Sequence, residues 1–254
     1  MNNSQPLRAL IVGVANDRSI AWAIARALHA RGAEIALTYL NDKARRFVEP
    51  LAESVNAALL MPLDVQVPEQ QAALFNALSE RWGGLDALLH SIAFAQREDL
   101  HGRVTDSSAS GFAEAMDISC HSLMRLTRSA LPLMGGGGSI LTLSYYGAEK
   151  AVPGYGIMGP VKAALEASVR ALAGELGPVG VRVNALSPGP LATRAASGIS
   201  GFDALLAAAT ERAPLAGGLD IELVGKAGAF LLSPEAAAIT GQTLRVDGGL
   251  SALA

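Results

Sequence analysis

The chain has 254 residues, of which 50% are hydrophobic and 17% are charged, and its formal net charge at pH 7 is −3. Its basic residues are scattered, which argues against the positive surface typical of nucleic-acid-binding proteins. The apolar content can fill one packed core and no Pro/Ser-rich or charge-rich linker interrupts it, so we predict a single domain over residues 1–254.

Cysteine usage and hydropathy bear on the compartment. Cys120 is the single cysteine, which excludes an intramolecular disulfide and fits a reducing environment. The first residues lack the pattern of a signal peptide, and no apolar run approaches the roughly 18 residues that a membrane span requires. We therefore expect a cytoplasmic protein that does not cross a membrane.

Short apolar runs alternate with longer helical patterns along nearly the whole chain, which is typical of repeated βαβ units. We predict strands at 7–14, 34–40, 57–65, 85–93, 139–145, 181–187 and 242–246, and helices at 20–31, 69–82, 112–134, 161–176 and 222–232. Right-handed crossovers place such helices on both faces of a parallel sheet. The predicted fold class is α/β: a doubly wound, Rossmann-type fold with a seven-stranded parallel sheet, in which ligands bind where strands end.

The segment 10–22 joins the first predicted strand to the first predicted helix. Gly13 allows close backbone approach, and Ser19 can cap a helix whose N-terminal N–H groups would bind a pyrophosphate. The segment lacks the Gly-x-Gly-x-x-Gly pattern of dinucleotide-binding folds. Taken alone, it therefore also fits a capped turn that binds no ligand.

Two tyrosine–lysine pairs follow the fifth predicted strand. Tyr155 and Lys162 are seven positions apart, so two helical turns would return them to one face. Such a phenol can donate to a developing negative charge that a neighbouring ammonium supports. Tyr146 and Lys150 have the ordinary Tyr-x-x-x-Lys spacing, but Tyr146 ends the predicted strand and Pro153 follows before a helix can start, so we interpret this pair as non-catalytic.

The residues around Tyr155 limit that geometric argument. Gly154 and Gly156 flank the tyrosine and would loosen its backbone. Pro160 predicts that the helix bearing Lys162 begins close to it, which leaves Tyr155 before the regular helix. From the residues alone, a loop tyrosine and a solvated helix lysine remain open alternatives.

Ordered motifs nevertheless extend over nearly the whole chain. They include Gly13-Val-Ala-x-x-Arg-Ser-Ile-Ala-Trp22, Thr38 to Lys43, Leu63-Asp64-Val65, His90 to Ala95, Leu143-Ser144-Tyr145, Tyr155 to Lys162, Gly180 to Ala185, Ser187-Pro-Gly-Pro190, Ala195 to Ile199 and Val246-Asp-Gly-Gly249. Together they resemble the NADH-dependent enoyl-acyl-carrier-protein reductases of the short-chain dehydrogenase/reductase superfamily. The resemblance implies hydride transfer from a nicotinamide cofactor to the double bond of a trans-2-enoyl thioester, in fatty acid biosynthesis.

The resemblance also implies roles for individual residues. Tyr155 would face the thioester oxygen, Lys162 would hold the nicotinamide ribose and support charge, and Tyr145 would orient the thioester. Its strand-end position leaves Tyr145 a core tyrosine as the alternative. Cofactor-binding positions would be Gly13, Ser19, Ile20, Leu40, Asp64, Val65, Ser91, Ile92, Lys162, Leu191 and Thr193, and Ala95 would join Tyr145 and Tyr155 in binding substrate. For Asp64 and Thr193 a capping role is the alternative, His90 is interpreted as a packed strand histidine, and no metal site is predicted.

Cofactor choice depends on the end of the second predicted strand. Leu40 offers no positive charge for the extra phosphate of NADPH, which favours NADH. Lys43, Arg45 and Arg46 keep NADPH open, although a solvated helix face explains them better.

The segment 191–210 resembles the family's mobile substrate-binding loop, in which Gly198 and Gly201 permit hinge motion. Ser200 follows Ser-Gly-Ile where family members often carry a basic residue facing the acidic carrier protein. The resemblance implies an acyl thioester partner, presented by acyl carrier protein, and a homotetramer. The alternatives are a carbonyl or alcohol oxidoreductase of the same superfamily and a catalytically silent dinucleotide-binding protein.

Overall fold

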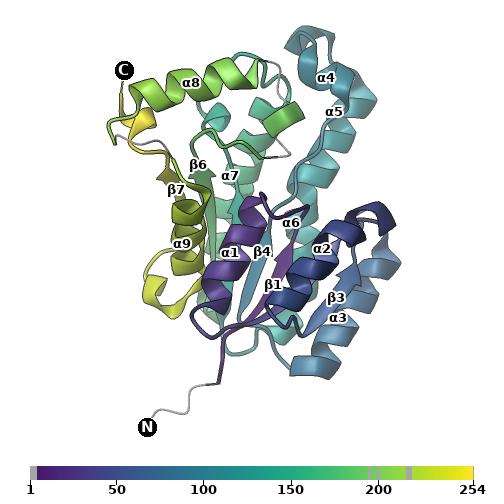
Figure 1. Cartoon of the computed structure of the whole chain (residues 1–254). Helices are drawn as coiled ribbons and strands as arrows, with labels where there is room; N and C mark the ends of the chain where they lie inside the picture. Colours follow the sequence, from purple (N-terminus) through teal and green to yellow (C-terminus); the bar gives the residue numbers. More distant parts are fainter. Residues whose placement is uncertain (1–4, 194–195, 199–200, 216–218, 254) are drawn as a thin grey trace.

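The computed structural model describes residues 5–193, 196–198, 201–215 and 219–253 (Figure 1). Within these residues the strands form one seven-stranded, all-parallel sheet in the order β3-β2-β1-β4-β5-β6-β7. The strands are β1 Arg8–Val12, β2 Glu34–Tyr39, β3 Leu59–Pro62, β4 Ala87–His90, β5 Gly138–Leu143, β6 Val181–Pro188 and β7 Thr243–Val246. The predicted Rossmann-type architecture is confirmed.

Helices cover both faces of this sheet. They are α1 Ile20–His29, α2 Asp42–Ser54, α3 Pro68–Trp82, α4 Arg97–His101, α5 Ala109–Met116, α6 Ser122–Ala130, α7 Met158–Leu176, α8 Phe202–Arg212 and α9 Ile221–Leu232. Helix α2 contains Lys43, Arg45 and Arg46, the three basic residues after β2. Their position agrees with the interpretation that they form a solvated helix face. Among the described residues, no helix combines the length and apolarity needed to cross a membrane.

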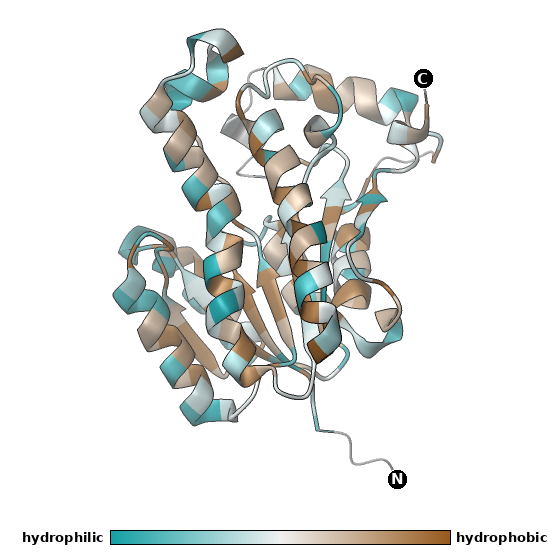
Figure 2. Cartoon of the chain, turned by 180° about the vertical axis from the view of Figure 1, so that it is seen from behind, coloured by the Kyte–Doolittle hydropathy of each residue, from teal (hydrophilic) through white to brown (hydrophobic). Residues whose placement is uncertain are grey.

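The strands β1 to β6 supply side chains to two separate cores. Leu10 and Leu88 pack with α3, α6 and α7 on one face, whereas Ile11 and Leu89 pack with α1, α2 and α9 on the other. Figure 2 shows the strands as brown, hydrophobic segments beneath helices that carry hydrophilic residues on their outer sides. Burial on both faces explains why the strands are continuous apolar runs and not alternating ones.

The predicted helix 112–134 is interrupted. Helices α5 and α6 flank a π-helical turn, Asp117–His121, and a short 3-10 turn, Leu131–Leu133, follows α6. A π-helical turn adds one residue to the helical period and redirects the side chains within it. Here it turns the buried Ser119 and Cys120 inward, towards the carboxyl ends of the strands.

The sheet winds in opposite directions from β1 and β4, so their carboxyl ends border the ligand-binding crevice of this fold class. Gly13 follows β1 with φ +101°, and a Cβ added there would lie 1.9 Å from the backbone oxygen of Ser91. A larger residue would separate the two strand ends, so glycine is required by packing as well as by backbone conformation.

Candidate active site

The first βα turn has the local structure that the sequence predicts. Ser19 precedes α1, and its Oγ accepts a hydrogen bond of 3.3 Å from the backbone N–H of Trp22. The side chain satisfies one of the N–H groups that lack a partner within the helix. The other N–H groups and the positive end of the helix dipole remain available to an anion at the crevice. Ile20 is the first residue of this helix.

Other proposed cofactor positions follow β3 and β4. The Asp64 carboxylate accepts 2.9 Å from the backbone N–H of Gln66, which closes a turn after β3. Asp64 does not cap the following helix α3, whose N-cap is Val67 without a side-chain hydrogen bond. Ser91 follows β4, and its backbone N–H donates to Val12 O over 2.9 Å. The structure thus brings the ends of β1 and β4 together, with Ile92 packed against the core below.

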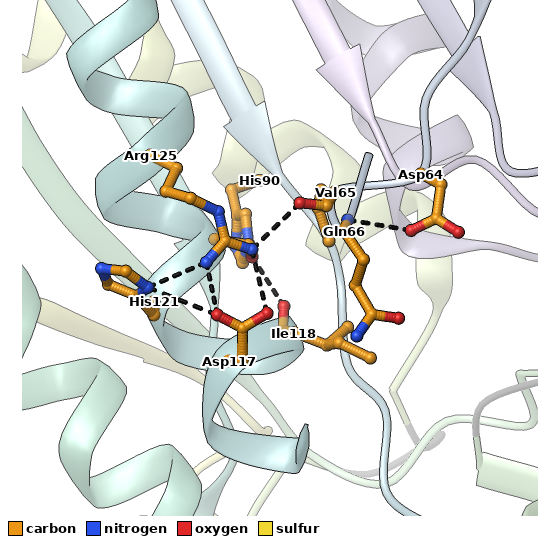
Figure 3. A network of polar contacts seen from close by, with 9 residues as sticks. Asp64, Val65, Gln66, His90, Asp117, Ile118, His121 and Arg125 are labelled. Atoms are coloured by element: carbon orange, nitrogen blue, oxygen red, sulfur yellow. Dashed lines mark hydrogen bonds and ion pairs between the residues drawn. The ribbon is translucent and has the colours of Figure 1, made fainter. Parts of the chain in front are cut away.

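Arg125 of α6 fixes the loop after β3 (Figure 3). Its Nη2 donates to Val65 O over 3.0 Å, while the guanidinium pairs with the Asp117 carboxylate and contacts His121. The hydrogen bond from Arg125 lowers the pKa of Asp117 below its ordinary value. Sequence reasoning missed Arg125, because no motif links it to a backbone oxygen 60 positions earlier.

Tyr145 and Tyr155 lie against each other. Their ring centroids are 4.8 Å apart with an interplanar angle of 62°, an edge-on arrangement. Tyr155 is 9% exposed and packs with Ile157, Met158 and Val161. Burial raises the pKa of both phenols, so both keep their protons at neutral pH and can donate hydrogen bonds.

Tyr155 reaches this position from a turn and not from a helix. Its N–H donates to Val152 O over 3.2 Å, and α7 begins at Met158 with Pro160 in its first turn. The position of the helix start confirms the prediction made from Pro160. Gly156 has φ +48°, and an added Cβ would lie 2.4 Å from Leu100 O, so this glycine packs tightly against α4 and does not loosen the segment.

Lys162 is buried, which contradicts the alternative of a solvated lysine. It is 5% exposed, and its Nζ donates to Leu143 O over 2.7 Å. Burial lowers the pKa of this ammonium from its ordinary value to about 8. The amine therefore lies at the carboxyl end of β5, where it contacts the backbone two residues before Tyr145.

These residues lie at the carboxyl edge of a sheet with the strand order of dinucleotide-binding folds. The chain is also similar to known proteins over nearly its full length. Residues 13–251 match the family model described as enoyl-(acyl carrier protein) reductase. The chain belongs to this family.

Individual relatives agree with the family match. The chain is 48% identical over 252 residues to the NADH enoyl-[acyl-carrier-protein] reductase FabI of a Nostoc species, covering 98% of each protein. It is 49% identical over 242 residues to NADH enoyl-[acyl-carrier-protein] reductase 1 of Rhizobium meliloti, covering 95% of this chain and 89% of the relative.

Solved structures of relatives show the same fold. The NADH-type reductase of Aquifex aeolicus superposes with a TM-score of 0.94 at 47% identity, covering 97% of each chain. The reductase of Anaplasma phagocytophilum, crystallised in complex with NAD, gives 0.93 at 47% identity and covers 97% of this chain and 94% of the other.

In this member of the family, the tyrosine–lysine pair with ordinary spacing lies in and directly after a 3-10 turn that follows β5, and not on an α-helix. Tyr146 does not end a strand as expected, since β5 stops at Leu143 and Tyr146 begins a 3-10 turn, Tyr146–Ala148. The Arg245 guanidinium lies 5.0 Å from its ring centroid, and Lys150 is exposed. Lys150 thus lacks the burial that Lys162 has.

His90 has the packing role expected of it. The ring is fully buried, with Nδ1 2.8 Å from Thr142 Oγ1 and Nε2 2.8 Å from Ser122 Oγ. The Ser122 hydroxyl also donates to Ile118 O, and the Thr142 hydroxyl donates to His90 O over 3.2 Å. Burial lowers the pKa of His90 to about 3, so it holds β4 against β5 and the start of α6 as a neutral group.

The remaining proposed positions are less completely described. Ala95 packs against the cluster that contains both site tyrosines, whereas Leu40 is 55% exposed after β2. Leu191 is buried, and Thr193 Oγ1 accepts 3.2 Å from the N–H of Ala196, a capping contact at the turn Ala196–Gly198. Within segment 191–210, residues 194–195 and 199–200, which include Ser200, lie outside the described residues.

Gly147 shapes the site although sequence reasoning passed over it. A Cβ added there would lie 2.5 Å from Cδ1 of the Tyr155 ring. The missing side chain provides the space that the phenol ring occupies. The only sequence signal was a glycine directly after two tyrosines, and its meaning depends on a ring eight positions further along the chain.

Proposed function

We propose that this chain reduces the carbon–carbon double bond of a trans-2-enoyl thioester by hydride transfer from NADH, as a step of fatty acid biosynthesis. The observation that carries the proposal is the placement of Tyr145, the buried Tyr155 and the buried Lys162 after the carboxyl end of β5. It combines two protonated phenols with one buried amine beside the crevice where this fold class binds dinucleotides.

The residues present fit a nicotinamide cofactor. Gly13 places no side chain at the start of the first turn, and the capped N-terminus of α1 faces the same crevice. A close backbone and free N–H groups together suit a pyrophosphate. Lys162 would hold the nicotinamide ribose, and the proposed positions Ser91, Ile92, Leu191 and Thr193 would line the cofactor. When bound, NADH supplies the hydride.

The side chains of the chain itself manage the charge that hydride addition creates. As the β-carbon gains the hydride, the double-bond electrons move to the thioester oxygen, and the resulting enolate later takes a proton at its α-carbon. Tyr155 donates a hydrogen bond to that oxygen, and its raised pKa keeps the proton on the phenol beforehand. Tyr145 and Ala95 orient the acyl group, and the Lys162 ammonium stabilises the anion.

A substrate panel tests the reaction. We expect the purified protein to oxidise NADH with crotonyl or longer trans-2-enoyl thioesters and to leave ketoacyl thioesters unchanged, measured as loss of nicotinamide absorbance. Turnover of ketoacyl thioesters alone would identify a carbonyl reductase, and binding of NADH without any turnover would identify a silent dinucleotide-binding protein.

The same assay run with both cofactors tests the preference for NADH. Leu40 stands at the end of β2 without a positive charge, and Arg45 is engaged by Glu49 over 2.8 Å on the exposed face of α2. We expect a kcat/KM for NADH at least about tenfold above that for NADPH. The extra phosphate of NADPH would lack a cationic partner, which weakens its binding free energy by on the order of 1.4 kcal/mol or more. A higher value for NADPH would mean that α2 contacts the phosphate.

The carrier, the assembly and the compartment are part of the proposal. Acyl carrier protein would present the substrate to the segment 191–210, within a single domain over residues 1–254, in the cytoplasm. Exposed apolar side chains at Phe112 and Met124 on the long helical segment, and at Leu244 on the edge strand β7, support a homotetramer. Light scattering of the purified protein measures the assembly, and a monomeric mass would contradict it.

A further inference from the structure

Glu166 is a buried carboxylate that the reaction described above does not use. It lies on α7 one helical turn after Lys162, and it is 6% exposed. Its Oε1 accepts a hydrogen bond from the hydroxyl of Ser144. A buried carboxylate is costly unless charged or hydrogen-bonding partners stabilise it, so its position beside the catalytic lysine calls for an explanation.

Helix α7 holds two consecutive residues at the end of β5. Lys162 Nζ donates to the backbone oxygen of Leu143, and Glu166 accepts from the side chain of the next residue, Ser144. Tyr145 follows directly, with its ring 4.8 Å from that of Tyr155. The two contacts therefore fix the backbone from which the Tyr145 ring projects, and they connect it to the helix that carries Lys162.

Glu166 also supplies negative charge near the buried ammonium. The titratable groups that act on Lys162 are Cys120 from the π-helical turn, Glu166 from its own helix and His90 from β4. His90 is neutral, and the Cys120 thiol lies 3.4 Å from the hydroxyl of Ser168. Burial, the largest effect, lowers the pKa of Lys162, whereas Cys120 and then the Glu166 carboxylate raise it.

The same charge acts on the phenol. The field of Glu166 contributes, after burial and Tyr145, to the raised pKa of Tyr155. A negative charge at this place therefore favours a protonated lysine and a protonated tyrosine together. These are the two protonation states that stabilisation of the thioester oxygen requires.

We propose that Glu166, tethered through Ser144, is a positioning residue that keeps the proton on Lys162 and holds the backbone in front of Tyr145. The inference rests on the proposed function, because its readout is the turnover of an enoyl thioester.

The first test is the pH dependence of kcat/KM for a crotonyl thioester in wild type and Glu166→Gln. Activity should fall as Lys162 loses its proton, so wild type should show an alkaline limb near the lysine pKa of about 8. Glutamine keeps the size and an acceptor for Ser144 but removes the charge. We expect the limb to move by about one unit to lower pH.

Matched variants separate charge from structure. Glu166→Asp retains the charge and should keep the limb close to that of wild type. Glu175→Gln makes the same chemical change at an exposed position of α7 and should change neither the limb nor the rate. Ser144→Ala removes the tether and keeps the charge, so we expect kcat to fall about fivefold while NADH affinity and the limb stay unchanged.

The outcomes distinguish the two levels of the proposal. A wild-type protein without enoyl reductase activity would refute the proposed function. An active wild type with superimposable profiles for folded Glu166→Gln would refute the charge role of Glu166. Should Glu166→Gln fail to fold, as judged by circular dichroism, Ser144→Ala remains decisive for the tether, since an unchanged kcat in that folded variant would overturn it.

Discussion

Tyr155→Phe is expected to lower the turnover of an enoyl thioester on the order of 100-fold or more, with a much smaller effect on NADH affinity. The hydroxyl interacts most strongly when charge develops on the thioester oxygen, so its loss raises the barrier more than it weakens ground-state binding. Phenylalanine keeps the ring that packs edge-on against Tyr145, which limits the change to the hydroxyl.

The matched controls are Tyr146→Phe and Lys150→Ala. Tyr146 lies under Arg245, and Lys150 is exposed, so both variants should keep near-wild-type rates. Single-turnover kinetics with a crotonyl thioester and a separate fluorescence titration with NADH measure the two effects. A large loss in Tyr146→Phe together with an active Tyr155→Phe would assign catalysis to the pair with four-residue spacing.

Lys162→Ala is expected to reduce NADH affinity about tenfold and turnover about 100-fold. The two losses together correspond to a decrease of roughly 1000-fold in kcat/KM for NADH. One ammonium is assigned both to the cofactor ribose and to charge stabilisation, so both quantities should fall together. The change also leaves Leu143 O without its 2.7 Å partner, and the free energy of unfolding should decrease.

Lys162→Met provides the control for packing, because it keeps the aliphatic stem in the buried position and removes the charge. We expect it to be as inactive as Lys162→Ala but closer to wild type in its midpoint of urea unfolding. A folded Lys162→Met with wild-type NADH affinity and rate would remove Lys162 from the site.

The sheet could be predicted because its signals are local in the chain. Strands such as β1 and β4 are short and mostly apolar, and the turn containing Gly13 and Ser19 has its glycine and cap at fixed offsets from a strand and a helix. Expected strands 57–65 and 85–93 were too long at both ends. At their carboxyl ends, apolar residues such as Leu63, Val65 and Ile92 continue the pattern of the strand but lie outside the sheet.

The helical periodicity argument for Tyr155 and Lys162 assumed that one helix carries both residues, but α7 begins at Met158. Tyr155 lies in a turn before α7, so a glycine-permitted backbone and packing against α4 position it, and not a shared helix face. The motif match predicted the same residues without predicting this geometry, because a resemblance carries positions along the chain and not the contacts that hold them.

By itself, the sequence determined the fold class, the family and the candidate residues, since periodicity, strand-ending turns and ordered motifs are properties of neighbouring positions. Only the tertiary structure decided that Lys162 is buried, that Glu166 holds Ser144 and that Arg125 holds Val65 O. The physical reason is that burial and hydrogen bonding depend on which distant segments pack together. A lysine on a helix looks the same in sequence whether its ammonium meets water or the end of a strand.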